Sequence, residues 1–262
     1  MSKEYKDYIN KIKLNKILVV ITRIFILIFC IILWQYAANK GLINTFITSS
    51  PKLVLNTIIK IYNQNNLFHH IEITIYETMI SFLLATLLGM LISIILWWNK
   101  FIDKVIDPYL TILNSLPKVA LGPIIIIWSG ANTKSIIIMA LLISLIITII
   151  NISNSFKSTD INKINLLKSF KATKLQILKY LIIPYNYNTL INSLKINLSM
   201  SLIGVITGEF LVSKEGIGYL IVYGSQVFNL SLVISGILIL LIVSYLMYLI
   251  VSLIEKILIK NN

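Results

Sequence analysis

The amino-acid sequence predicts an all-α integral membrane protein that crosses a bilayer six times. Of its 262 residues, 57% are hydrophobic and only 13% are charged, and the mean hydropathy is +0.88. Several apolar runs are long enough to cross about 30 Å of hydrocarbon as helices. The net charge of +13 comes mainly from lysines that stand between these runs, so nucleic acid is not an expected partner.

Six apolar runs divide the chain. The first follows five lysines, and it is longer than the apolar core of about 7–15 residues in a secretory signal, so we expect an uncleaved signal anchor. The expected regions are a cytoplasmic N-terminal segment (1–16), a single transmembrane domain (17–255) and a cytoplasmic tail (256–262). The expected spans are residues 17–38, 71–98, 105–128, 135–152, 188–212 and 228–254.

The lysines also predict which side each loop faces. Segments 1–16, 99–104, 157–187 and 256–262 together hold fifteen lysines, whereas the three loops on the opposite side hold five. Loops that are rich in Lys and Arg remain in the cytoplasm. We therefore expect a multi-pass protein of the cell (cytoplasmic) membrane, surrounded by membrane lipid, with both termini in the cytoplasm.

A short helix is expected on the outer side, before the second span. Ser50 has the side chain of an N-cap, and Pro51 suits the first helical position. The apolar residues after Pro51 share one face as far as about Tyr62. This helix is expected to lie in the membrane interface.

Three prolines and a lysine distinguish the third predicted span. Pro108, Pro117 and Pro123 interrupt it, and Lys118 lies near its middle. Proline frees backbone carbonyls, which a bilayer tolerates where protein or a watery cavity surrounds them. A lysine at this depth usually faces a cavity or a partner. The span is therefore a candidate for lining a translocation path; the alternative is that Lys118 reaches the interface through its long side chain.

The fifth predicted span combines small residues with a buried charge. Gly204 and Gly208 form a small-xxx-small pair, which lets helices approach closely. Glu209 follows within the same apolar run, and a carboxylate there needs a partner. Lys118 and Lys195 are the candidate cations, and a structural hydrogen bond at the outer membrane edge is the alternative.

The polar loop 157–187 is predicted to be folded, although it lies between two spans. Asp160 can cap a first short helix, and Thr173 with Gln176 forms a T-x-x-Q capping box for a second. Pro184 is expected to end that second helix. A loop that only joined two spans would need no such structure, so we interpret it as a docking surface for another protein.

Catalytic and metal-binding patterns are absent from the sequence. It contains no GxxxxGK[ST], HExxH or GxSxG motif. The single cysteine, Cys30, lies within an apolar run and makes no disulfide framework. His69 and His70 are adjacent and point to different faces of a helix, which disfavours a shared metal site. We expect a non-catalytic protein with no cofactor and no metal.

The segment NLLKSFKATKLQILKYLIIP resembles the EAA motif of the membrane subunits of binding-protein-dependent ABC importers, E-A-A-x3-G-x9-I-x-L-P. Residues 165–167 take the place of E-A-A, and Lys171 takes the place of the glycine. The distal I-x-L-P spacing holds, ending at Pro184. The segments SLPKVALGPIIIIWSGANTKS and SLIGVITGEFLVSKEGIGYLI are similar to the nitrate/sulfonate/taurine permease group, which usually has an arginine where this chain has Glu77.

The resemblance implies a six-helix permease with a cytoplasmic coupling helix. Two such subunits form the pore, and here we expect a homodimer. Separate cytoplasmic ABC ATPase subunits bind the coupling helices and hydrolyse ATP. An extracytoplasmic solute-binding protein delivers the substrate. The expected substrate is a small nitrate-, sulfonate- or taurine-like anion; a pyrimidine-type thiamine precursor is the alternative. From other classes, an ion-gradient-driven secondary transporter and a non-transporting scaffold are the competing hypotheses.

The resemblance and the patterns within the spans together assign residues to three roles. The ATPase-docking residues are Asn165, Leu166, Leu167, Lys168, Phe170, Lys171, Ala172, Thr173 and Pro184. The translocation path is assigned to Pro117, Lys118, Pro123 and Glu209, and packing between permease copies to Gly204 and Gly208.

The substituted glycine makes a specific structural prediction. A left-handed backbone costs a lysine about 1–2 kcal/mol. We therefore expect either a strained Lys171 or, preferably, a smoother helical joint. With the motif's glutamate absent, docking is expected to rest on Leu166, Leu167 and Phe170, with the lysines facing acidic groups.

Overall fold

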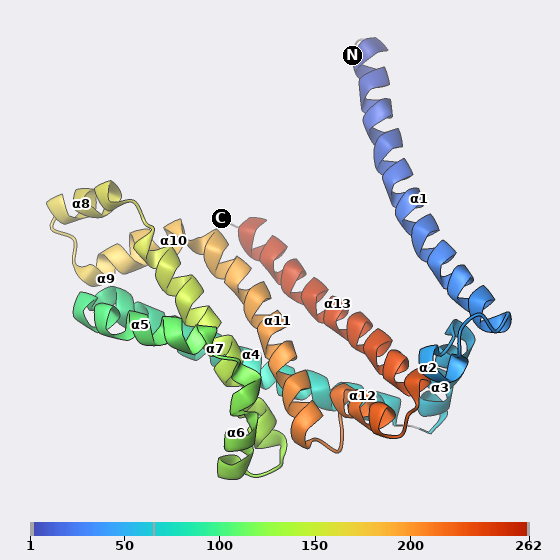
Figure 1. Ribbon diagram of the computed structural model, residues 1–262. Helices are drawn as coiled ribbons and strands as arrows, with labels where there is room; N and C mark the ends of the chain where they lie inside the picture. The colour runs from blue at the N-terminus through green and yellow to red at the C-terminus, as the bar shows by residue number, and fades with distance from the viewer. Residues whose placement is uncertain (1–2, 65, 261–262) are drawn as a thin grey trace.

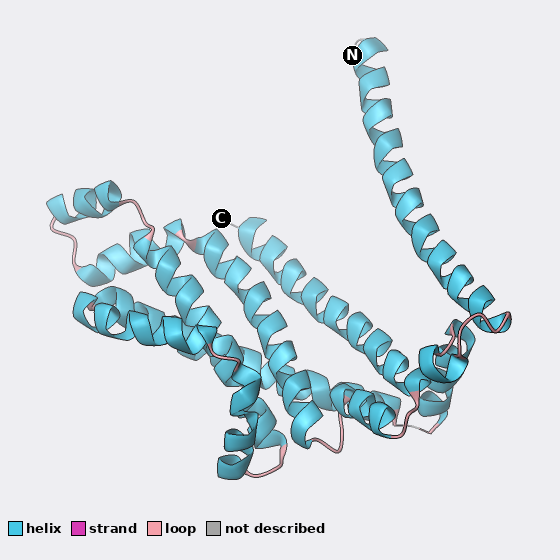
Figure 2. Cartoon of the chain, in the orientation of Figure 1, coloured by secondary structure: helices cyan, strands magenta, loops and turns pink. Residues whose placement is uncertain are grey.

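The computed structural model of the chain describes residues 3–64 and 66–260, and the regular structure in these residues is helical (Figure 1, Figure 2). A 3-10 turn, η1, covers Lys118–Leu121, and a π-helical turn, η2, covers Leu178–Ile182. In chain order the helices are α1 (Lys3–Asn39), α2 (Thr45–Thr48), α3 (Pro51–Asn63), α4 (Leu67–Trp98), α5 (Lys100–Ser115), α6 (Gly122–Ser129), α7 (Thr133–Lys157), α8 (Ile161–Ser169), α9 (Lys174–Ile177), α10 (Ile183–Tyr185), α11 (Tyr187–Val212), α12 (Ile217–Gln226) and α13 (Leu230–Lys260).

Helix α1 stands apart from the other helices (Figure 1). Its apolar stretch Leu14–Asn39 is long enough to cross a bilayer, and its side chains from Leu14 to Leu33 are exposed within this chain. The helix is attached near its end, where Gln35 Oε1 accepts a 3.0 Å hydrogen bond from the backbone N–H of Lys52. Lipid or another chain must therefore surround most of its surface in a membrane.

Helix α7 is the centre of the bundle, because it packs along both α4 and α11. Small residues allow these close approaches. A Cβ added to Gly89 of α4 would lie 2.6 Å from Thr148 Cγ2, so this contact between α4 and α7 requires glycine. Asn197 Nδ2 also donates a 2.6 Å hydrogen bond to Thr86 Oγ1, which joins α11 to α4 within the apolar interior.

The third predicted span is not a straight helix. Helix α5 meets the η1–α6 segment at an angle of 93°, so the predicted span 105–128 contains two helices that cannot both follow one membrane normal. The break lies at Leu116 and Pro117, where the residue before a proline is restricted to extended backbone. Pro108 lies inside α5 without ending it. The described residues thus contain five spanning helices, or six if the bent pair is one span.

The other spans keep their predicted places with longer ends. Helices α4, α7 and α13 begin or end a few residues beyond the predicted limits, and α11 matches residues 188–212 closely. The helix predicted after Ser50 is confirmed, because Ser50 Oγ accepts a hydrogen bond from the backbone N–H of Leu53. Helix α12 was not predicted, because its short apolar sequence IGYLIVY merges with the apolar run of the last span.

The two ends of the bundle carry different structures. The Lys3 end of α1, the Lys260 end of α13 and helices α8 to α10 lie toward one end, and α2, α3 and α12 lie toward the other (Figure 1). This arrangement agrees with an even number of crossings. The cellular side on which each end lies remains a prediction.

Candidate functional site

The loop 157–187 is a folded pair of helices, and both predicted caps are confirmed. Asp160 Oδ1 accepts a 2.8 Å hydrogen bond from the backbone N–H of Asn162 at the start of α8. Thr173 and Gln176 form the capping box of α9: the Thr173 N–H donates to Gln176 Oε1 at 2.7 Å, and the Gln176 N–H donates to Thr173 Oγ1 at 3.3 Å. Side chains close to each other in sequence therefore fix both helix starts.

The joint between α8 and α9 is sharp, and Lys171 forms it in the left-handed conformation with φ of 60°. Its N–H donates to the Lys168 carbonyl at 2.8 Å, and the Ala172 N–H donates to the Leu167 carbonyl at 3.0 Å. These two bonds are the Schellman pattern of a helix C-terminus. The preferred expectation of a smoother joint is wrong, because the backbone bonds hold the turn even without glycine.

A buried polar network closes the base of the loop. Asn186 Nδ2 donates to Thr159 Oγ1 and to the Ile182 carbonyl, each at 2.8 Å. Ser155 Oγ donates to Asn186 Oδ1, also at 2.8 Å. The network connects the end of α7 to the residue before α11, so the loop leaves and re-enters the bundle at one fixed point.

The apolar residues of the loop divide between its inner and outer faces. Leu167 and Ala172 are half-buried, and they pack on a core cluster formed by Ile152, Phe156, Ile177, Leu178 and Ile182. Leu166 and Phe170 point outward, with 58% and 75% of their surfaces exposed. Leu167 and Ala172 therefore support the loop, while Leu166 and Phe170 are available to a partner.

The outer surface of the loop is basic and polar. Asn165, Lys168 and Lys171 are exposed on it together with Leu166 and Phe170. Pro184 is also exposed, but it does not end the second helix, which is a correction. The helix passes through the π-helical turn η2, closed by the Ile183 N–H to the Leu178 carbonyl, and ends after Tyr185.

The residues assigned to the translocation path fall into two separate places. Pro117, Lys118 and Pro123 lie at the bend between α5 and α6, and both prolines are exposed. Lys118 is half-buried, and its ammonium donates a 3.0 Å hydrogen bond to the Asn114 carbonyl. Lys118 thus lies at the break of the span that the prolines predicted to be interrupted.

Glu209 is not paired with either candidate lysine. Its carboxylate is 1% exposed and accepts a 2.6 Å hydrogen bond from Thr74 Oγ1 and another from the Gly218 N–H. Lys195 forms an ion pair with Glu255 of α13 instead. The expectation that Glu209 pairs with an intramembrane cation is therefore wrong. The structural hydrogen bond of the alternative is present, while its position at the outer membrane edge stays a prediction.

Glu209 belongs to a three-residue clasp at the start of α12, which the sequence did not reveal. The clasp is His70, Thr74 and Glu209: His70 Nδ1 accepts the Gly216 N–H at 3.0 Å, and Thr74 Oγ1 accepts the Ile217 N–H at 2.9 Å. The first N–H groups of a helix lack partners in their own helix. Here α4 and α11 supply those partners, and together they fix α12.

The clasp leaves no room for larger residues in the turn before α12. Gly216 has φ of 97°, and a Cβ on it would lie 2.3 Å from Glu209 Oε1.

The carboxyl of Glu77 lies beside Glu209, is 1% exposed, and accepts no hydrogen bond within the described part of the chain.

Gly204 and Gly208 pack inside the chain, which corrects the expectation that they join two copies. A Cβ on Gly204 would lie 2.4 Å from the Ala140 Cα, and one on Gly208 would lie 2.9 Å from Ile136 Cγ2. Both contacts are with α7 of the same chain. The small-xxx-small face of α11 is thus already occupied.

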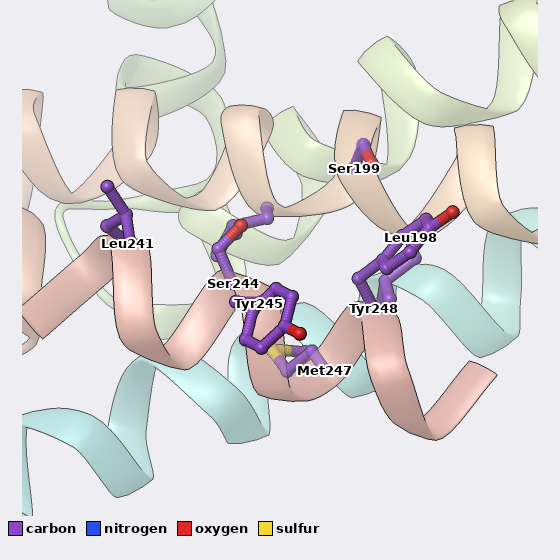
Figure 3. A pocket seen from close by; sticks show the side chains of 8 residues that line it. Leu198, Ser199, Leu241, Ser244, Tyr245, Met247 and Tyr248 are labelled. Atoms are coloured by element: carbon purple, nitrogen blue, oxygen red, sulfur yellow. The ribbon is translucent and has the colours of Figure 1, made fainter. Parts of the chain in front are cut away.

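A groove between α11 and α13 is a second feature that sequence patterns missed (Figure 3). Its volume is about 370 Å³, and Ser199, Ser244, Tyr245 and Tyr248 place hydroxyl groups along it. The Lys195 ammonium lies 5.6 Å from the centre of the Tyr248 ring. Lys195 and Glu255 form an ion pair near this groove, and ionisable side chains within spanning helices usually pair with one another.

Comparison with known proteins agrees with this architecture. Residues 82–260 match the family described as binding-protein-dependent transport system inner membrane component. A Bacillus subtilis protein named as an aliphatic sulfonates transport permease is 26% identical over 88% of this chain and 83% of its own length. The formylaminopyrimidine transport permease of Halalkalibacterium halodurans is 26% identical over 72% of this chain and 74% of its own.

A solved structure shows the same fold. An inward-facing methionine ABC transporter, MetNI, contains a chain that superposes with a TM-score of 0.63 at 16% identity, over 74% of this chain and 96% of that one. The family match over residues 82–260 runs from within α4 to the end of α13 and includes the whole 157–187 loop. This chain therefore belongs to the family of binding-protein-dependent transport system inner membrane components.

Proposed function

We propose that this chain is the permease subunit of an ATP-driven importer for a small sulfonate-like anion. In this proposal the 157–187 loop is cytoplasmic and docks on an ABC ATPase subunit through Leu166 and Phe170, with Lys171 facing acidic groups. Two copies of the chain form the pore. An extracytoplasmic solute-binding protein delivers the substrate to the end that carries α3 and α12.

The observation that carries the proposal is the exposed pair Leu166 and Phe170 on a loop fixed at both ends. Exposed side chains of this size on a rigid turn are typical of a site that binds another protein. The loop is held by buried hydrogen bonds at Asn186 and by its core cluster, so a force on α8 reaches the spanning helices.

The contacts around the loop indicate how docking would move the path. Ser155 belongs to α7, and Asn186 immediately precedes α11, so the base of the loop joins the two central helices. Lys157 also lies 2.7 Å from Asp103 Oδ1 and 3.2 Å from Asp107 Oδ1, which ties the start of the loop to α5. Movement of the docked loop is thereby transmitted to the bend at Pro117, Lys118 and Pro123, which we place on the translocation path.

Co-purification with the ATPase subunit tests the docking proposal. Leu166→Asp with Phe170→Asp should abolish co-purification, because two exposed apolar contacts would become charges. Leu42→Asp with Phe46→Asp is the matched control, since both residues are exposed at the opposite end. An ATPase that remains bound to the loop variant would contradict the proposal.

Labelling from outside intact cells tests the orientation. In a Cys30→Ser background, Lys163→Cys in α8 should resist a membrane-impermeant maleimide, and Lys214→Cys should react with it. Both lysines are exposed, so burial does not protect either position. The reverse pattern would place the loop outside and exclude an ATPase partner.

Uptake measurements decide the substrate. The sulfonate assignment rests on the Bacillus relative, and the Halalkalibacterium relative favours a formylaminopyrimidine as the second candidate. Cells that express the transporter with its binding protein should take up a labelled alkanesulfonate, and uptake should stop when this chain is deleted. Uptake of the formylaminopyrimidine alone would select the second candidate.

A further inference from the structure

A pocket lies between the 157–187 loop and the junction of α4 and α5, away from the exposed pair Leu166 and Phe170. We call it the interfacial pocket, and its volume is about 620 Å³. Such a volume suits a small ligand or a lipid headgroup. The residues used below are Trp97, Trp98, Lys100, Ile164, Lys168 and Lys174.

The pocket carries three positive charges from three different helices. Lys100 is the first residue of α5, Lys168 lies in the last turn of α8, and Lys174 begins α9. Among the side chains that the structure describes, none of these ammonium groups takes part in an ion pair, and no acidic residue lines the pocket. Three like charges around one cavity repel each other, so an anion between them would be stabilising.

The contacts of Lys174 show that the charges lie at the end of a spanning helix. Its ammonium donates a 3.3 Å hydrogen bond to the carbonyl of Trp98, the last residue of α4. Trp97 and Trp98 line the pocket, and tryptophans at the end of a span mark the level of the lipid headgroups. The three lysines therefore lie at the depth of phosphate groups.

One side of α5 continues from the pocket as an apolar stripe. Phe101 lines the pocket with 76% of its surface exposed, and Val105, Tyr109 and Ile112 follow on the same face. A helix with such an exposed face lies against acyl chains. A ligand in the pocket thus meets cations at one end and an apolar surface at the other.

We propose that the interfacial pocket binds the phosphate headgroup of an anionic phospholipid, with Lys100, Lys168 and Lys174 around the phosphate and an acyl chain along the apolar stripe of α5. The lipid joins α4 and α5 to α8 and α9. The site is independent of substrate, and of its three lysines only Lys168 is also exposed on the docking face with Leu166 and Phe170.

Lipid retention measured by native mass spectrometry tests this proposal. The full-length protein is reconstituted in nanodiscs of equal phosphatidylglycerol and phosphatidylcholine and released into neutral detergent. About one phosphatidylglycerol per chain should remain bound. Lys100→Gln with Lys168→Gln and Lys174→Gln should weaken retention on the order of a hundredfold, about fivefold for each lysine.

Two control variants distinguish a specific lipid-binding site from a general effect of positive charge. Lys52→Gln with Lys134→Gln and Lys214→Gln removes the same charge from exposed positions at the other end, and it should retain the lipid. Arginine at the three pocket positions should also retain it. Equal retention of both lipids, or equal loss in the control variant, would overturn the proposal.

Two further measurements distinguish other ligands of the same lysines. Inorganic phosphate at 10 mM should not displace the lipid; displacement together with phosphate binding on its own would assign the pocket to a free phosphate. Lys100→Gln with Lys174→Gln, which leaves Lys168 on the docking face unchanged, should still co-purify with the ATPase subunit. If the ATPase no longer co-purifies while lipid retention is unchanged, the lysines bind the ATPase, and the proposed lipid site is wrong.

Discussion

Asn186 Nδ2 donates a 2.8 Å hydrogen bond to Thr159 Oγ1, and this bond joins the two ends of the 157–187 loop. Both residues are buried at the point where the loop meets the bundle. Because Asn186 also accepts from Ser155 of α7, one side chain connects the loop to a central helix. The rigidity of the docking surface therefore depends on a residue outside it.

Asn186→Ala should loosen the loop while leaving the bundle folded. The substitution leaves Ser155 and Thr159 buried with fewer partners, at a cost of about 1–3 kcal/mol for a buried unsatisfied group. Hydrogen exchange of the amides in α8 and α9 should become faster. Asn154→Ala is the control, since Asn154 is exposed and lies next to Ser155 in α7. Unchanged exchange in the Asn186 variant would show that the loop is held elsewhere.

Lys171→Gly should stabilise the joint between α8 and α9. At φ of 60° a lysine carries about 1–2 kcal/mol of strain that glycine does not. Slower hydrogen exchange in α8 is the expected measurement. The same substitution at Lys168, which lies within α8, should instead destabilise by about 1 kcal/mol. A destabilised Lys171 variant would mean that the loop does not keep this turn.

Thr74→Val should release α12 from the rest of the protein. The change keeps the shape of the side chain but removes the hydroxyl that donates to Glu209 and accepts from the Ile217 N–H. We expect a loss of about 1–3 kcal/mol and faster exchange in α12. Thr78→Val is a matched control, because within the described residues the Thr78 hydroxyl makes one hydrogen bond, to the Thr74 carbonyl of its own helix. Equal effects of the two variants would argue against the clasp.

The sequence predicted the features that depend on neighbouring residues. Asp160 and Thr173 cap helices whose N–H groups lie two or three residues away, so local patterns reveal them. The partners of Glu209 could not be found in this way, because Thr74 lies 135 residues from it. A lone carboxylate within the membrane suggests a cationic partner. Unpaired N–H groups at the start of a helix can donate hydrogen bonds to the carboxylate equally well.

The bend in the third span shows a second limit of prediction from sequence. The three prolines marked the segment as irregular, but only the break at Leu116 and Pro117 changes the direction of the chain. Pro108 is tolerated within α5. Sequence spacing alone does not distinguish a proline inside a helix from one at a turn, because the surrounding backbone decides which carbonyls find partners.

Gly204→Ala tests whether this glycine serves the fold or an interface between copies. The added Cβ would lie 2.4 Å from the Ala140 Cα, which is backbone and cannot rotate away, so α7 and α11 must separate. Overpacking of this kind costs about 1–3 kcal/mol. We expect a lower unfolding temperature in detergent.

The concentration dependence of this unfolding distinguishes the two roles. A contact within the chain predicts the same loss of stability at every protein concentration, because no association is involved. Ile203→Ala, at the neighbouring exposed position, should have little effect. If the loss of stability disappears when the protein is diluted, Gly204 lies at an interface between two copies. A concentration-independent loss would show that the glycine is required because α7 passes too close for any side chain.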